Sequence, residues 1–144
     1  RQYIIEQLYQ TKSIATLRLW GQALAHLHYD ASLGLVSSTV TREDFARSGA
    51  QEEDLYDIIH ELIATSPDEK MTLLLHEHKS TDKKQIHGIL FTEKGYDSKQ
   101  LTAKFNATGD ATQASFSIRD KSLKQAEELV ITEIRKKISG SVVK

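Results

Sequence analysis

The sequence predicts an α/β (α+β) domain in which a mixed four-stranded sheet is flanked by helices. Three observations support this class. Segments with apolar residues three and four apart begin at capping residues, which is typical of amphipathic helices. Runs rich in β-branched or alternating residues lie between them, which is typical of strands. The 144 residues are 39% hydrophobic and 27% charged, a size and composition that allow one domain with its own core.

Residues 1–28 carry two helical patterns. A short amphipathic stretch over residues 3–9 is followed by a helix that Ser13 can cap and that runs to about His28. We expect residues 1–28 to form linker helices that project from a body made of residues 29–144. Residues 29–32 are expected to be a turn, and residues 33–40 the first strand.

Two helices are expected next. Thr41 followed by Asp44 resembles a capping box for a short helix that ends at Gly49, a typical left-handed cap. A longer helix over residues 51–64 ends at Ser66, Pro67 and Asp68.

The second half of the chain alternates strands with shorter helical segments. Residues 71–78 and 85–92 read as an antiparallel hairpin, and residues 112–118 alternate polar with apolar side chains as a half-buried strand does. Asp97 or Ser98 caps a short helix that runs to Phe105, and residues 106–110 are expected to be a loop. The last helix starts at the capping box over residues 122–125 and is expected to close at Gly140.

Composition excludes several classes of function. The 19 Lys and Arg residues nearly balance the 20 Asp and Glu residues, so the large basic field of a sequence-blind nucleic-acid binder is lacking. The absence of cysteine excludes disulfides, thiolate zinc sites and cysteine nucleophiles. No apolar run reaches the roughly 18 residues of a membrane helix, so we expect no membrane partner. The chain opens at Arg1 without a secretory signal pattern, so we expect a cytoplasmic piece of a longer protein.

Two groups of residues are candidates for chemistry. Asp57 and His60 lie three apart on the expected helix, a spacing that more often marks a solvated helix face. In a symmetric hairpin His76 faces His87, and His78 points to the same side. Three imidazoles on one face could bind zinc. The favoured alternative is a polar edge of the sheet, because Leu74 and Ile89 continue the same face into the core.

The order of the segments resembles the C-terminal half of the DHH-family phosphoesterases, metal-dependent hydrolases of nanoRNA, pAp, dinucleotides and polyphosphate. The resemblance covers nearly the whole chain. Residues 6–10 and 17–24 look like the helices that join the two halves of these proteins. Residues 40–45 with Gly49, Ala50 and residues 53–55 look like the strand and helix pair that follows.

Residues 105–116 decide how far this resemblance extends. The family carries a phenylalanine, a glycine run ending in histidine (GGGH) and small residues here. Phe105, Gly109, Ala114 and Phe116 fit, whereas Asp110 stands in place of the histidine. The resemblance implies a degenerate substrate-binding site made of residues from this loop and one cation from the preceding strand, where arginine is usual: Lys94, Asn106, Thr108, Gly109, Asp110 and Thr112.

The resemblance also implies what surrounds this chain. Its catalytic residues and its Mn or Mg would belong to an N-terminal catalytic domain of the same protein, so no cofactor is expected in this chain. The expected ligand is a short nucleotide or another phosphorylated molecule, bound weakly. Whether the chain forms a homodimer is left open by the resemblance. Two functions follow: a substrate-recognition domain that is non-catalytic on its own, or an interaction or dimerisation module that has lost phosphate binding.

Overall fold

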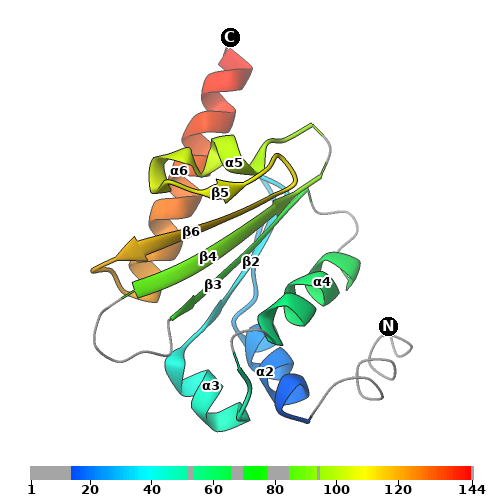
Figure 1. Ribbon diagram of the computed structural model, residues 1–144. Coiled ribbons are helices and arrows are strands. Elements are labelled where there is room, and N and C mark those ends of the chain that lie inside the picture. The colour runs from blue at the N-terminus through cyan, green and yellow to red at the C-terminus, as the bar shows by residue number, and fades with distance from the viewer. Residues whose placement is uncertain (1–13, 52–53, 66–69, 78–84, 94, 144) are drawn as a thin grey trace.

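A computed structural model describes residues 14–51, 54–65, 70–77, 85–93 and 95–143. The stretch over residues 3–9 and the cap at Ser13 therefore lie outside the described residues. Within these ranges the strands form one six-stranded sheet (Figure 1). Their order across the sheet is β1 (His28–Asp30), β2 (Leu35–Val40), β3 (Met71–Glu77), β4 (Gln85–Thr92), β6 (Gln113–Arg119) and β5 (Thr108–Gly109).

The sheet is mixed, which confirms the expected fold class. Strands β2 and β3 are parallel, and every other neighbouring pair is antiparallel. The expected number of four strands is wrong, because β1 and β5 extend the sheet at its two edges. Strand β1 stands where a turn over residues 29–32 was expected, and β5 lies within the expected loop 106–110.

Helices cover the two faces of the sheet unequally. Helices α2 (Ile14–Ala25), α3 (Arg42–Ser48) and α4 (Leu55–Thr65) pack on one face, over β2 and β3. The opposite face is covered by α6 (Leu123–Val143) together with α5 (Ser98–Leu101) and a 3-10 turn over Ala103–Phe105. Each face has its own buried cluster. The first cluster is centred on Leu19, Phe45, Ile58, Ile59 and Leu74, and the second on Leu73, Leu75, Leu90, Val130 and Ile134.

The burial patterns of β3 and β4 show which part of the sheet is not covered by helices. Nearly every residue of β3 is buried, because helices cover both of its faces. Strand β4 alternates between buried and half-buried positions. Its buried residues, Ile86 and Leu90 among them, face α6, whereas His87, Ile89 and Phe91 are half-buried on the side of α4. This face of β4 therefore remains accessible beside α4.

The helix ends confirm most of the capping analysis. The Thr41 and Asp44 side chains each accept the other's backbone N–H, at 3.0 Å and 2.9 Å, and Gly49 ends α3 with a φ of 78°. Asp97 caps α5 by accepting the amide of Gln100. The expected stop at Gly140 is wrong, since α6 continues to Val143. One glycine inside a helix costs only about 1 kcal/mol, which does not end a long helix. None of the described helices is long and apolar enough to cross a membrane.

Candidate functional site

The structure brings five of the six expected site residues onto one hairpin. Asn106 ends the 3-10 turn, Thr108 and Gly109 form β5, and Asp110 and Thr112 belong to the turn into β6. All five are exposed at the edge of the sheet. The sixth, Lys94, lies outside the described residues.

Asp110 closes the turn of this hairpin on itself. Its backbone N–H donates to the Gln113 carbonyl at 2.8 Å. Its carboxylate oxygen Oδ1 accepts the backbone N–H groups of Thr112 and Gln113, at 2.9 Å and 3.0 Å. This arrangement is an Asx turn, a frequent use of aspartate in loops. The amides of Thr112 and Gln113 are therefore bound to a carboxylate of the same chain.

Gly109 is required by the hairpin itself. Its φ is 136°, a conformation that side chains with a Cβ rarely adopt. A Cβ at this position would collide with the Gln113 carbonyl oxygen and lie 2.9 Å from the Ala114 Cα. Because both obstacles are backbone atoms, they cannot move aside as a side chain can. The glycine thus allows β5 to approach β6.

Buried hydroxyls fix this turn to the end of β4. The Thr92 hydroxyl donates to the Ala111 carbonyl at 2.8 Å, and the Ser98 hydroxyl donates to the Thr112 carbonyl at 3.0 Å. The backbone N–H groups of the same two residues also donate to the turn, Thr92 to Thr112 and Ser98 to Ala111. Ser98 is fully buried and Thr92 nearly so. The turn is therefore held in a defined place.

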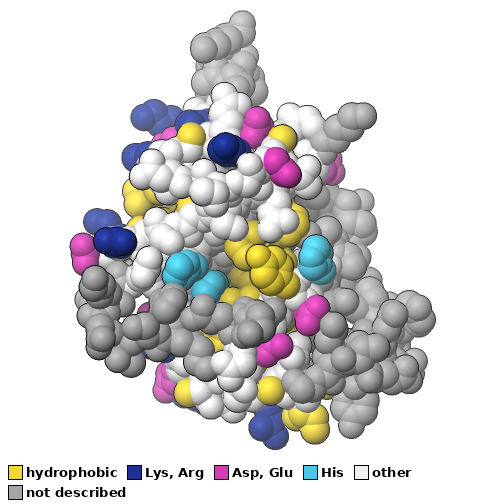
Figure 2. Space-filling model, viewed as in Figure 1, with side chains coloured by type: hydrophobic (Ala, Val, Ile, Leu, Met, Phe, Trp, Pro, Cys, Tyr) yellow, Lys and Arg dark blue, Asp and Glu magenta, His cyan; other side chains and the backbone are white. Residues whose placement is uncertain are grey.

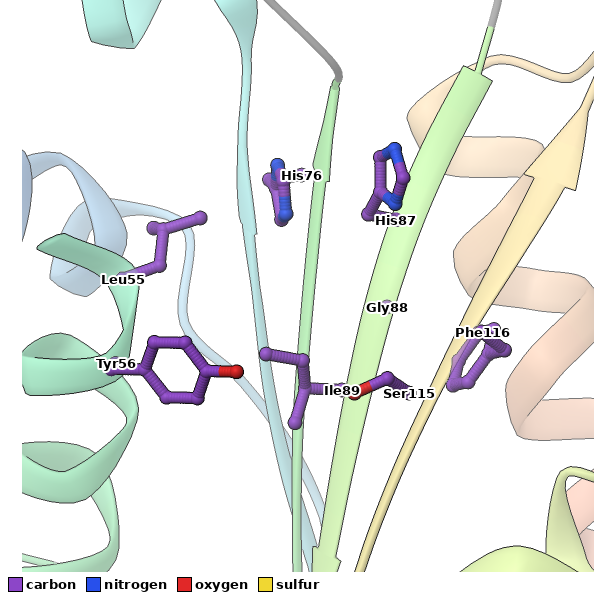
Figure 3. A pocket seen from close by; sticks show the side chains of 8 residues that line it. All are labelled: Leu55, Tyr56, His76, His87, Gly88, Ile89, Ser115 and Phe116. Atoms are coloured by element: carbon purple, nitrogen blue, oxygen red, sulfur yellow. The ribbon is translucent and has the colours of Figure 1, made fainter. Parts of the chain in front are cut away.

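A hollow of about 240 Å³ lies on the accessible face beside this hairpin (Figure 3). Leu55 and Tyr56 line it from α4, and Ile89 and Ser115 line it from β4 and β6 (Figure 3). The remaining lining residues are His76, His87, Gly88 and Phe116. In Figure 2 this face shows histidine side chains on either side of a hydrophobic area.

His76 and His87 lie opposite each other in the β3–β4 register, as the hairpin analysis predicted. Their rings stack with centroids 5.4 Å apart and planes 17° apart. The His76 Nδ1 lies 3.3 Å from the Glu77 carbonyl oxygen, and the His87 Nδ1 lies 3.3 Å from the Ser117 hydroxyl. The edge of Phe45 packs against the His76 ring.

Of the three histidines expected to bind zinc, the described residues include only His76 and His87. His78 lies outside the described residues. Within the described part of the chain, no group of three or more His, Asp or Glu side chains is placed to hold a metal ion. The other candidate pair lies on α4, where the exposed His60 places its ring against Phe91, with centroids 5.6 Å apart.

The hollow itself was not found from the sequence. Tyr56 and Ile89 are far apart along the chain, and only the packing of α4 beside β4 brings both to one hollow. Two sequence features could have indicated the hollow. Tyr56 is an aromatic residue on the polar side of an amphipathic helix, and the outward positions of the strand over residues 85–92 hold His87, Ile89 and Phe91 instead of charged residues.

Comparison of the sequence with protein families and with curated proteins gives no match. Comparison of the structure gives two informative neighbours. An exopolyphosphatase-related protein from Bacteroides fragilis superposes with a TM-score of 0.76 at 17% identity, over 94% of this chain and 38% of its own. A pGpG-specific phosphodiesterase from Vibrio cholerae superposes with a TM-score of 0.56 at 15% identity, over 90% of this chain and 41% of its own.

This chain therefore spans well under half the length of either neighbour. At these identities the likeness concerns the fold. The chain shares its fold with a part of each of these two proteins.

Proposed function

We propose that this chain is the substrate-recognition domain of a DHH-type phosphoesterase and is non-catalytic on its own. The observation that carries the proposal is the match of nearly the whole chain to a minor part of a larger protein, with 94% of this chain covering 38% of the exopolyphosphatase-related neighbour. The ligand would be a short nucleotide or another phosphorylated molecule. An N-terminal domain of the same protein would supply the chemistry in the cytoplasm.

The proposed division of labour assigns the metal ligands to the catalytic domain. Metal-assisted phosphoester hydrolysis needs carboxylates and imidazoles clustered around the ion. The described residues offer no cluster of three such groups. Mn or Mg would accordingly be held by the catalytic domain, while this chain would hold the ligand against it.

The position of the expected loop also supports recognition. The hairpin turn is fixed to the end of β4, and Thr108 of the hairpin pairs with Ser115, which lines the hollow. Thr108 and Thr112 contribute exposed hydroxyl-bearing side chains at this edge. A ligand that contacts both the turn and the hollow would have only a few residues of β4 to span.

A second candidate function is an interaction or dimerisation module that no longer binds phosphate. The carboxylate of Asp110 favours it, because this group occupies the amides of Thr112 and Gln113. A carboxylate about 5 Å from a phosphate charge costs roughly 3 kcal/mol at an effective dielectric constant of 20. That cost reduces affinity by about two orders of magnitude.

Calorimetric titration of the purified chain distinguishes the two functions. The chain is titrated at low salt with pGpG and with tripolyphosphate, and each mixture is then incubated with Mn²⁺ and assayed for released products. Recognition predicts saturable binding of at least one ligand with no hydrolysis. If neither ligand binds and analytical ultracentrifugation shows a dimer, the chain is an interaction module instead.

A further inference from the structure

We propose that the hollow beside α4 holds a nucleobase, so that the domain selects nucleoside phosphates over inorganic polyphosphate. The inference rests on the proposed recognition function and narrows its ligand class. The hollow lies outside the loop of residues 106–112 that the sequence resemblance indicates, and its lining residue Ser115 pairs with Thr108 of that loop. Along β4, Ile89 lies three residues before Thr92, which contacts the turn, a separation of roughly 10 Å in a strand.

The size of the hollow suits one ring rather than a whole ligand. Its volume is about 240 Å³, below the roughly 300–1,000 Å³ of sites that enclose a complete small molecule. A dinucleotide would place one base in the hollow and leave its phosphates outside. The phosphates would then lie on the open face, in the direction of the hairpin turn.

The lining is apolar and aromatic where a ring would lie flat. Ile89 forms part of the sheet surface, and Tyr56 reaches toward it from α4 (Figure 3). The Tyr56 side chain is 52% exposed, so one face of its ring is accessible for stacking. Stacking on aromatic side chains is the usual way in which proteins hold an unpaired base.

Polar groups of the lining match the edge of a base. The Tyr56 hydroxyl points toward Ile89 in Figure 3, and the Ser115 hydroxyl comes from the neighbouring strand. The stacked rings of His76 and His87 form a further wall. Hydroxyls can both donate and accept hydrogen bonds, as the edges of bases require.

The charges of the lining disfavour polyphosphate. None of the described residues that line the hollow is lysine or arginine. Proteins bind chains of phosphates through Arg, Lys and clusters of backbone N–H groups. Uncharged hydroxyls and apolar surface would leave the charge of a polyanion uncompensated, whereas a neutral base carries no charge that needs compensation.

The experiment is a set of two-dimensional ¹H–¹⁵N NMR titrations of the whole chain with guanosine, adenosine, pGpG and tripolyphosphate. We expect one nucleoside and pGpG to shift the amide signals of Tyr56, Ile89 and Ser115, and tripolyphosphate to leave them in place. Tyr56→Ala should weaken pGpG binding about tenfold, the effect of losing one stacked base. Tyr29→Ala is the matched control, because Tyr29 is 61% exposed at the far edge of the sheet.

The outcomes separate this inference from the recognition function. If pGpG binds but shifts only the signals of residues 106–112, or if Tyr56→Ala and Tyr29→Ala bind equally well, the hollow is not a base site and recognition still stands. If only tripolyphosphate binds, the ligand class is wrong and recognition stands. If no probe binds, both the inference and the recognition function are wrong.

Discussion

His76 and His87 stack across the β3–β4 hairpin, with ring centroids 5.4 Å apart, although the two residues differ in burial. His76 is 7% exposed and packs against Phe45, whereas His87 is half-buried at the accessible face. His76 thus contacts the core residue Phe45 of α3, and both histidines line the hollow.

The unequal burial predicts unequal stability effects. His76→Ala should lower the free energy of unfolding by about 2 kcal/mol, because it leaves a cavity against Phe45. His87→Ala should lower it by less than about 1 kcal/mol, since water can fill the space. Urea unfolding of both variants measures the difference, and equal losses would contradict this account of the pair.

Gly88 should tolerate no side chain. A Cβ there would collide with the Phe116 ring and lie 2.7 Å from Leu75 Cδ2, both in the cluster under α6. Gly88→Ala should therefore lower the free energy of unfolding by about 1–3 kcal/mol through overpacking. Gly21→Ala is the control, because no described atom outside its own stretch of α2 lies within 4 Å of its Cβ position and alanine favours helix. Thermal unfolding should show a lower Tm for the first variant and an equal or higher Tm for the second.

Gly109→Ala should disrupt the β5–β6 hairpin more than Gly34→Ala disrupts the β1–β2 turn. Both glycines have positive φ, so both substitutions carry a strain of about 1–2 kcal/mol. A Cβ at Gly109 would meet backbone, whereas the nearest atoms to a Cβ at Gly34 belong to the flexible Lys70 side chain. Amide hydrogen exchange of Asp110 and Ala114 should accelerate in Gly109→Ala alone. Unchanged protection there would show that the close approach is not needed.

The lowered pKa of Asp30 predicts that the folded protein loses stability in acid. The Ser32 hydroxyl bond is the largest cause that lowers the pKa of Asp30; burial opposes it, and Arg135 and the Leu33 amide lower the pKa further. A carboxyl whose pKa is lower in the folded chain stabilises the fold above its unfolded pKa and loses this contribution as pH falls through the folded value. Below about pH 4, Tm should therefore fall more steeply for the wild type than for Asp30→Asn. Parallel pH profiles of Tm would contradict this role.

The sequence predicted the elements that repeat a pattern over many residues. The bounds of β4 and the facing of His76 and His87 follow from a hairpin with alternating burial, and the caps at Thr41 and Gly49 follow from local hydrogen bonding. Strands β1 and β5 have only three and two residues, too few for a periodic signal. Their pairing depends on neighbours already in place, so local sequence does not reveal it.

The candidate sites differ in the same way. The turn of residues 106–112 could be located from its glycine and its flanking phenylalanines, because these are local features. The role of Asp110 as a turn cap depends on hydrogen bonds to amides two and three residues further on, and the sequence alone does not distinguish this role from contact with a ligand. The hollow depends on α4 packing beside β4, which no local pattern encodes.

The central claim is that the hairpin turn is the phosphate-facing loop of a recognition domain. Its most direct test is a variant that restores the family pattern, with Asn106→Gly, Ala107→Gly, Thr108→Gly and Asp110→His. Asp110→Asn is the control, because an asparagine keeps the oxygen that accepts the turn amides and removes only the charge. Circular dichroism confirms that each variant is folded, and calorimetry measures pGpG affinity at low salt, where phosphate contacts are strongest.

The account predicts at least a tenfold gain in affinity for the restored variant, a smaller gain for Asp110→Asn, and a further gain when Glu93→Arg is added to the restored variant. A folded restored variant that binds pGpG no better than the wild type would contradict the claim and would leave the turn as a connection within an interaction module.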